Sequence, residues 1–477
     1  MNNVPTELWN YANDGDLIFK RYHDKYVASE APWFNDRLHA FLFATMDEVR
    51  LRHAADCAKA VLRPIDYEDA DRFRQGVLKR EVSGLISYQR QRDHAAHTLY
   101  NYLLGWYFYT HLASIRQAIS TAFKNRKYQG DVMDFAGLWP FVSVMHDIGY
   151  LFEGSLTPLS LATENEQVSM GLRIMRDYFS HEFWLASGAT SVADRNCLRD
   201  MADVTELSFP GESLRTLADC LRDLHDLEQL RLTILSERRE KKIEPNEPDP
   251  IAKEKGLPGD AFDIWCSHYE HFGPPSMVNR IKRLEKAFEW IMNEGLGATG
   301  IRLLDHATCS GLLLLLISTF YFRVHFGIGN SKPDSEYRRR VRDKFLDRRS
   351  RYEALWWWSA VVWATAATAL HNIQQLPTCW PEHVGPTIPL SIEEDPLAFL
   401  GILVDCLQEW DRYTVSRETV VAGQLPLQGA DVIMDHSNGQ VIVDYRDLSV
   451  SRDVKKGLDR SLLGWQSYID LRPKEAP

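Results

Sequence analysis

A histidine and an aspartate stand next to each other, as His146 and Asp147, in the otherwise apolar segment VSVMHDIGY. Imidazole nitrogen and carboxylate oxygen are both ligands of divalent transition metals. On a helix, neighbouring side chains diverge by about 100°, so the pair can serve one ion only where other helices bring further ligands to the same place. The pair therefore predicts a metal site that needs one ligand from upstream and one from downstream.

The upstream candidate is His97, in the segment RDHAAHTLYNYLLGWYFY. The residues after it are apolar almost all round, which is typical of a buried helix, and a buried polar side chain is costly unless it has a partner. His94 lies three residues earlier on the same helical face and is the alternative ligand. A histidine in this helix could equally be a hydrogen-bonded core residue.

The downstream candidate is Asp405, the lone carboxylate within the apolar stripe of DPLAFLGILVDCLQEWDR. Asp395 is the expected N-cap of this helix and Pro396 its first residue. Gly401, four residues before Asp405 on the same face, should leave room above the carboxylate for an ion or a substrate. The alternative is that Asp405 is a buried carboxylate that pairs with Arg412 or another cation.

Two imidazoles and two carboxylates form a mixed nitrogen and oxygen ligand set. Such a set suits Mn, Fe, Co, Ni or Zn, and it suits Mg less well because imidazole is softer than the ligands Mg prefers. It also leaves coordination positions for water and a phosphate oxygen. This arrangement produces hydroxide near neutral pH and stabilises charge at a phosphoryl centre, so the candidate chemistry is metal-assisted hydrolysis with one or two divalent ions.

The order of these ligands on helices of a mostly α protein resembles the HD superfamily of metal-dependent phosphohydrolases. The resemblance covers roughly residues 90–412, and it is to the version of the domain found in bacterial conflict and antiphage systems. The segments that carry it are RDHAAHTLYNYLLG, MHDIGY, DHATCSGLLLL, ALHNI and DPLAFLGILVDCLQEWDR.

In that family four residues bind one metal, and the aspartate of the pair often bridges to a second. The primary ligands that the resemblance implies are His97, His146, Asp147 and Asp405. His306 and His371 fall where family members with two metals place additional histidines. Each also has an ordinary structural interpretation, since His306 could begin a helix and His371 suits the negative end of one.

The sequence departs from the family beyond the histidine-aspartate pair. Members that hydrolyse deoxynucleoside triphosphates commonly read HDxGHxPFGH, whereas this chain reads HDIGYLFEG. Tyr150 replaces a histidine, and Glu153 is the nearest titratable group, so either Glu153 is the acid or base or the chemistry differs. Arg92 and Arg412 could hold phosphates or could simply be solvated. The catalytic residues that the resemblance implies are Asp147, Glu153, His306 and His371.

Apolar residues recur at helical spacing up to about residue 412, and strand-like alternation is nearly absent there. We expect a mainly α fold with a helical region at 1–89, an HD-type helical bundle at 90–415 and a long helical and linker insertion at about 188–299. After this helical part, apolar and polar residues alternate on both sides of Asn438-Gly439 in the segment GADVIMDHSNGQVIVDYRD. This alternation predicts a β-hairpin. Residues 416–477 should therefore form a small α/β appendix.

Composition limits the function classes. The 477 residues are 45% hydrophobic and 25% charged, as in globular proteins, and the net charge of −11 argues against binding of duplex nucleic acid. Seven scattered cysteines without a C-x-x-C pair predict neither disulfides nor a thiolate zinc site. The start lacks a secretory signal pattern, and the two longest apolar runs, 311–322 and 354–370, are too short to span a membrane. We expect a cytoplasmic protein.

The sequence thus favours a metal-dependent phosphohydrolase acting on nucleotides, with deoxynucleoside triphosphates the best single substrate and antiphage defence the role that the resemblance implies. In this mechanism Asp147 orients the nucleophile, and Arg92 or Arg412 neutralises phosphoryl oxygens. A homo-oligomer with a nucleotide effector or a partner protein is expected. The alternatives are a cyclic or oligonucleotide phosphodiesterase or nuclease, a nucleotide sensor without turnover, and a helical interaction protein without metal.

Overall fold

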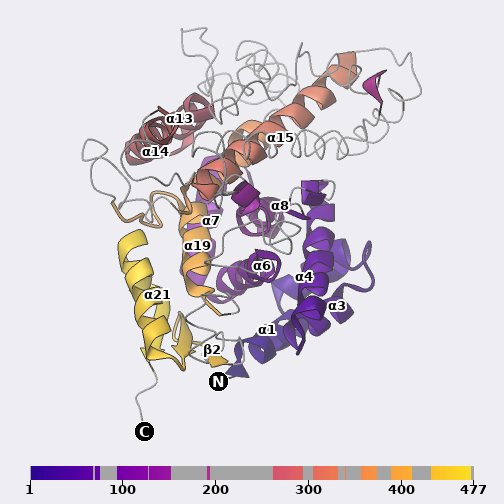
Figure 1. The fold of residues 1–477 in the computed structure, drawn as a ribbon, viewed down its shortest axis with the longest axis vertical. Helices are drawn as coiled ribbons and strands as arrows, with labels where there is room; N and C mark the ends of the chain where they lie inside the picture. The colour runs from indigo at the N-terminus through magenta and orange to yellow at the C-terminus, as the bar shows by residue number, and fades with distance from the viewer. Residues whose placement is uncertain are drawn as a thin grey trace, which may run out of the picture. The chain divides into compact units, whose positions relative to one another are not determined.

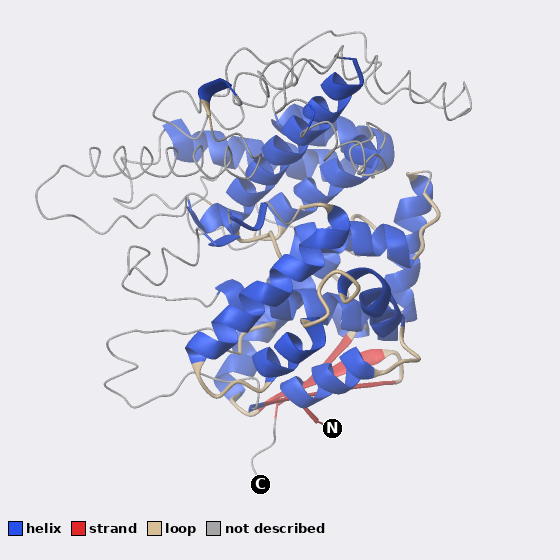
Figure 2. Ribbon diagram, turned by 90° about the vertical axis from the view of Figure 1, so that its right-hand side faces the viewer, coloured by secondary structure: helices blue, strands red, loops and turns tan. Residues whose placement is uncertain are grey.

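The computed structural model of the chain describes residues 2–67, 70–72, 74–75, 94–126, 128–151, 191–193, 261–293, 305–330, 339, 356–372, 388–410 and 431–473. These residues are mostly helical, with one small sheet near both chain ends (Figure 2), which confirms the prediction of a mainly α fold with a β-containing C-terminus. The chain divides into two compact units. Among the described residues the first unit holds 2–148 and 370–473, and the second holds 149–369.

Helices make up most of the first unit. They are α1 (Val4–Asn13), α2 (Ile18–Tyr22), the π-helix η1 (His23–Val27), α3 (Phe34–Leu42), α4 (Asp47–Leu62), the 3-10 helix η2 (Arg63–Ile65), α6 (His94–His111), α7 (Ala113–Asn125), α8 (Val132–Ser143), α19 (Pro396–Leu407), α21 (Leu448–Ser461) and the 3-10 helix η8 (Trp465–Ser467).

Helix α6 is the central helix of this unit. It contacts α4, α8 and α19, which surround it in Figure 1. Its residues 96–109 are all buried, as the nearly unbroken apolar sequence predicts. A polar side chain on this helix therefore faces the protein interior, where it must find a partner.

Helices α6 and α8 pack tightly against each other at Gly105. A Cβ added to Gly105 would lie 1.8 Å from Cζ2 of Trp139, whose Nε1 donates a hydrogen bond of 2.9 Å to the Tyr102 carbonyl. The Trp139 ring therefore has little freedom to move away. We expect Gly105→Ala to lower the free energy of unfolding by about 1–3 kcal/mol, as measured by chemical denaturation.

Gly457, inside α21, is the matched control for this prediction. A Cβ added there would meet only Cys406 Sγ, at an ordinary 3.8 Å, so Gly457→Ala should stabilise the protein by about 0.5–1 kcal/mol through helix propensity. Equal effects of the two substitutions would contradict the packing that we describe.

The sheet joins the two ends of the chain. Its strands are β1 (Asn2–Asn3), β2 (Val432–Ser437), β3 (Gln440–Tyr445) and β4 (Ile469–Pro473), in the order β1-β2-β3-β4. Strands β1, β2 and β3 pair antiparallel, whereas β3 and β4 pair parallel with α21 between them in sequence. Asn438 and Gly439 turn the β2–β3 hairpin with φ of 53° and 78°, which confirms the predicted hairpin.

The second unit contains α13 (Ala261–Phe272), α14 (Pro275–Asn293), α15 (His306–Asn330), the π-helix η5 (Trp357–Val361) and all of α18 (Val362–Leu370) except its last residue. A 3-10 turn, η4 (Ile148–Leu151), links the units in sequence. Only α13 and α14 represent the predicted insertion among the described residues, with three residues at 191–193. Across the described ranges, no helix combines the length and the apolar character needed to cross a membrane.

Candidate metal centre

Two of the predicted ligands come from helices that the sequence places correctly. His97 lies in the first turns of α6 and is 4 % exposed, and Asp405 lies near the end of α19 and is 8 % exposed. Helix α19 begins as predicted, with Asp395 Oδ1 accepting hydrogen bonds from the backbone amides of residues 397 and 398. Buried helices therefore hold both side chains inside the first unit.

Gly401 has a different role from the one expected. A Cβ at this position would lie 2.8 Å from Cγ1 of Val142 on α8. The absent side chain lets α19 approach α8 closely, and it does not leave space for an ion. The prediction of an open pocket above Asp405 at this residue is wrong because a neighbouring helix fills that space.

His146 and Asp147 lie in a turn after the end of α8, and not on a helix as the sequence suggested. The last turn of α8 closes with the amides of Val144 and Met145 both bonded to the Pro140 carbonyl. Because the pair leaves the helix, its side chains are freed from the helical divergence of about 100°. The turn therefore allows adjacent residues to face one point.

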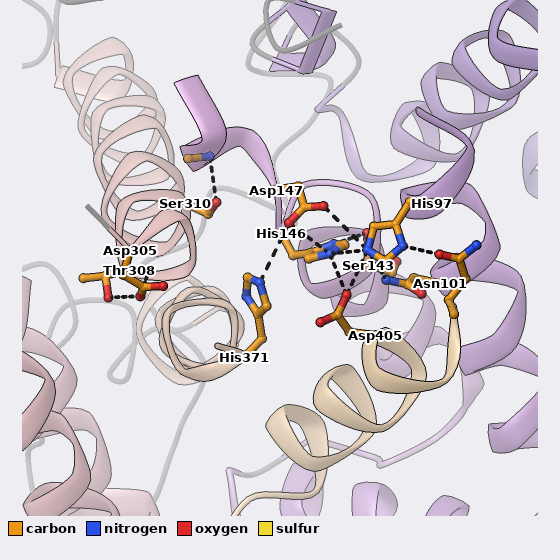
Figure 3. A network of polar contacts seen from close by, with 12 residues as sticks. His97, Asn101, Ser143, His146, Asp147, Asp305, Thr308, Ser310, His371 and Asp405 are labelled. Carbon is orange, nitrogen blue, oxygen red and sulfur yellow. Dashed lines mark hydrogen bonds and ion pairs between the residues drawn. The ribbon is translucent and has the colours of Figure 1, made fainter. Parts of the chain in front are cut away.

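The four predicted ligands converge in the first unit (Figure 3). Asp405 Oδ1 lies 2.8 Å from His97 Nε2 and 3.7 Å from His146 Nε2. Asp147 Oδ1 lies 3.2 Å from His146 Nε2, and its Oδ2 lies 3.6 Å from His97 Nε2. The two Nε2 atoms are 3.3 Å apart. All four side chains are buried.

These spacings match those of ligands around one metal ion. Ligand atoms about 2.0–2.2 Å from a metal lie about 3.0 Å apart at neighbouring octahedral positions and about 3.4 Å apart in a tetrahedron. The five separations, from 2.8 to 3.7 Å, bracket both values. The residues of this centre therefore fit a divalent ion.

Hydrogen bonds to the outer ring nitrogens fix which atom faces the centre. His146 Nδ1 lies 2.6 Å from the Ser143 carbonyl, which can only accept, so Nδ1 carries the proton. His97 Nδ1 bonds to Gln408 Oε1, and the Gln408 amide is oriented by its Nε2, which donates to the Trp410 carbonyl at 2.5 Å. Each neutral imidazole thus directs the lone pair of Nε2 inward, as in metal-binding histidines.

The converging atoms all carry electron pairs, so a proton or a metal ion must lie among them to hold them together. Burial by itself lowers the pKa of His146, but the carboxylates of Asp147 and Asp405 and the carbonyl of Ser143 outweigh it, and the net pKa is raised. In the metal-free protein His146 therefore keeps its proton to a higher pH than an ordinary histidine does.

This raised pKa predicts how metal binding depends on pH. A metal must displace the proton from His146, so we expect the affinity for Mn²⁺ to fall by up to about tenfold for each pH unit below the raised pKa. The proton stabilises the metal-free fold at low pH, and this stability is lost as pH rises through the raised pKa. The thermal shift caused by Mn²⁺ should therefore grow with pH, and a shift independent of pH between 5 and 8.5 would contradict this expectation.

His371 extends the centre on the far side of Asp147. Its Nε2 lies 3.8 Å from Asp147 Oδ1, and its ring centroid lies 4.9 Å from that of His146. His371 is 4 % exposed. A separation of 3.8 Å exceeds a hydrogen bond, but it suits two ligands of one ion. Asp147 Oδ1 thus lies near both His146 and His371, whereas its Oδ2 lies near His97.

His306 belongs to the second unit and begins α15. The residue before it, Asp305, caps that helix by accepting from the Thr308 amide at 2.9 Å. The His306 ring stacks on Tyr150, with centroids 3.9 Å apart and 12° between planes. Glu153, Arg92 and Arg412 lie outside the described residues, and so does the side chain of His94.

Two buried residues of the centre were missed by the sequence analysis. Asn101 Nδ2 lies 3.1 Å from His97 Nε2, and Gln408 bonds to His97 Nδ1. Asn101 follows His97 by one helical turn, which is a detectable signal. Gln408 lies just beyond the end of α19, and no local pattern points from it to a histidine 311 residues earlier in the chain.

Gln408 should be needed for metal affinity because it holds His97 in the binding tautomer. We expect Gln408→Leu to weaken Mn²⁺ binding by about 10–100-fold, as outer partners of metal-binding histidines do, measured by equilibrium dialysis. Tyr445→Phe is the control, since it removes a hydrogen bond to the Leu407 carbonyl at the same helix end without touching His97. A loss of Mn²⁺ affinity in Tyr445→Phe but not in Gln408→Leu would contradict the role of Gln408.

No family model matches the chain, no curated protein matches it, and no solved structure matches it.

Proposed function

We propose that this chain is a metal-dependent phosphohydrolase that acts on nucleotides. The observation that carries the proposal is the convergence of His97, His146, Asp147 and Asp405 in one buried cluster. Two imidazole nitrogens with carboxylate oxygens suit Mn, Fe, Co, Ni or Zn better than Mg. The order of the ligands along the chain also resembles the HD superfamily, which favours hydrolysis of phosphoester or phosphoanhydride bonds.

His97, His146, Asp147 and Asp405 would hold the ion, which would supply a Lewis acid able to lower the pKa of water and to stabilise charge on a phosphoryl oxygen. Asp147 would help to hold the ion and would orient the water that attacks phosphorus. His371, 3.8 Å from Asp147 Oδ1, can bind a phosphoryl oxygen or a second ion. Burial of these groups strengthens their electrostatic effect.

The finer parts of the proposal rest on the resemblance. Deoxynucleoside triphosphates are the best single substrate class, Arg92 and Arg412 would hold phosphates, and Glu153 would act as acid or base. The family likeness also suggests a homo-oligomer in the cytoplasm, with a nucleotide effector or a partner protein, and a role in antiphage defence. Each of these is a separate proposal, and the substrate panel tests the first of them, the substrate class.

The experiment is a substrate panel. Purified chain loaded with Mn²⁺ or Co²⁺ is incubated with deoxynucleoside triphosphates, ribonucleoside triphosphates, cyclic dinucleotides and single-stranded oligonucleotides, and products are separated by chromatography. We expect metal-dependent release of phosphate or triphosphate from the deoxynucleotides, abolished by EDTA. Cleavage of the cyclic dinucleotides or oligonucleotides instead would change the proposed substrate class, but it would still support metal-dependent hydrolysis of phosphate bonds. Metal binding without any hydrolysis would overturn the enzyme proposal.

A nucleotide sensor without turnover is the second candidate. It is favoured by Tyr150, which stands where the resembled triphosphohydrolases have a histidine and which stacks on His306. Such a tyrosine cannot donate a proton at neutral pH as readily as a histidine. This alternative predicts that calorimetry detects nucleotide binding at the metal-loaded protein while the panel yields no product.

A further inference from the structure

Asn101 lies on α6 one turn after His97, so the two side chains share a face of the helix. It is 1 % exposed. Its Nδ2 lies 3.1 Å from His97 Nε2, the ring nitrogen that faces Asp147 and Asp405. Its Oδ1 is buried and has no hydrogen-bond partner among the described residues. A buried amide oxygen without a partner is costly, so this orientation of the amide calls for an explanation.

The contact between Asn101 Nδ2 and His97 Nε2 does not suit a metal-loaded cluster. That nitrogen accepts a hydrogen bond only while its single lone pair is free. A metal ion would take that lone pair and leave the Asn101 N–H without an acceptor at this place. In the metal-loaded state the amide oxygen, and not the amide nitrogen, is the atom that belongs beside His97 Nε2.

A half-turn of the amide about its last bond brings the oxygen to this place. The turn exchanges Nδ2 and Oδ1 with almost no change of shape. The oxygen would then lie about 3.1 Å from His97 Nε2, which is close to the separation of about 3.0 Å between neighbouring ligands of an octahedral ion. The turned oxygen therefore lies at the distance from His97 Nε2 that is expected between two neighbouring ligands of one ion.

We infer that Asn101 supplies its amide oxygen as a fifth protein ligand of the metal centre, an inference that rests on the proposed function. The ligand set becomes two nitrogens and three oxygens from His97, His146, Asp147, Asp405 and Asn101. Additional oxygen ligands and a coordination number above four favour Mn²⁺ over Zn²⁺, which prefers four ligands in a tetrahedron. Asn101 thus acts on metal selectivity as well as on affinity.

Two substitutions distinguish an oxygen ligand from a structural hydrogen-bond donor. Asn101→Leu keeps the size and removes both polar atoms. Asn101→Asp keeps the oxygen and removes the N–H. If Asn101 serves as an oxygen ligand, we expect the leucine variant to bind Mn²⁺ at least about tenfold more weakly, and the aspartate variant to bind it as tightly as wild type or more tightly.

Mn²⁺ affinity is measured by electron paramagnetic resonance of the free ion, and Zn²⁺ affinity by competition with a chelating dye. The ratio of Mn²⁺ to Zn²⁺ affinity should fall in Asn101→Leu. Tyr102→Phe is the control, since it removes a buried hydrogen bond to His23 from the next position of the same helix. Thermal unfolding in EDTA checks that each variant is folded.

Equal Mn²⁺ affinity in wild type and Asn101→Leu would overturn the inference and leave the metal centre intact. An aspartate variant as weak as the leucine variant would also overturn it, because the N–H would then be the group that matters. A wild type that binds no Mn²⁺ would overturn the proposed function itself, and this inference with it. A weaker leucine variant, a retained aspartate variant and an unchanged control would support Asn101 as a ligand.

Discussion

Asp405→Asn should bind Mn²⁺ at least about 100-fold more weakly than wild type, since even residues that only orient metal ligands cost 10–100-fold when removed. The substitution keeps the shape of the side chain and removes the negative charge that lies 2.8 Å from His97 Nε2 and 3.7 Å from His146 Nε2. It also removes one of the two carboxylates that raise the pKa of His146. Equilibrium dialysis with elemental analysis measures the change.

Asp395→Asn is the matched control on the same helix. Asp395 is 1 % exposed and accepts hydrogen bonds from the first turn of α19. Since asparagine is an N-cap nearly as good as aspartate, this variant should keep its metal affinity and nearly all its stability. Unchanged Mn²⁺ affinity in Asp405→Asn, or an equal loss in both variants, would contradict the assignment of Asp405.

Asp147→Asn should reduce the hydrolytic rate kcat/KM by at least about 1,000-fold. Stabilisation of charge at a metal centre is worth several kcal/mol in the transition state, and each 1.36 kcal/mol is a factor of ten in rate. Asp147 is the residue whose carboxylate neighbours His97, His146 and His371. Its amide replacement loses the charge that, under the proposed function, would hold the ion and orient the nucleophile. The assay uses the substrate that the nucleotide panel identifies.

Asp435→Asn provides the matched control for activity. Asp435 also stands beside a histidine, His436, but it lies on strand β2 and accepts a hydrogen bond from the His436 amide. It is a second histidine-aspartate neighbour pair away from the metal centre, and its substitution should leave kcat/KM unchanged. Activity that persists in Asp147→Asn would show that hydrolysis takes place elsewhere.

Local signals in the sequence were enough to predict part of the fold. The cap at Asp395 and the turn at Asn438-Gly439 both follow from short-range chemistry, and both are confirmed. Strand β1 was not predicted, since it contains only Asn2 and Asn3, which have poor strand propensity. It forms because β2 offers a free edge with which the chain start pairs, and pairing between distant segments leaves no local pattern.

The sequence was enough to predict the ligands of the candidate site, but not the residues that surround them. His97, His146, Asp147 and Asp405 stand out because each is a polar residue in an apolar segment, where an unpaired polar group is costly. Their convergence depends on tertiary packing. The turn that carries His146 and Asp147 has an apolar sequence, which is typical of a buried helix. Gln408 could not be found in this way, because its role depends on a contact across 311 residues.

The most direct test of the metal centre is anomalous diffraction from crystals of the protein soaked with Mn²⁺. We expect one strong anomalous peak in each chain within about 2.0–2.3 Å of His97 Nε2, His146 Nε2 and oxygens of Asp147 and Asp405, and no such peak in crystals of Asp405→Asn treated in the same way. A wild-type crystal at saturating Mn²⁺ with no peak among these four residues, or with its peak elsewhere, would contradict the account.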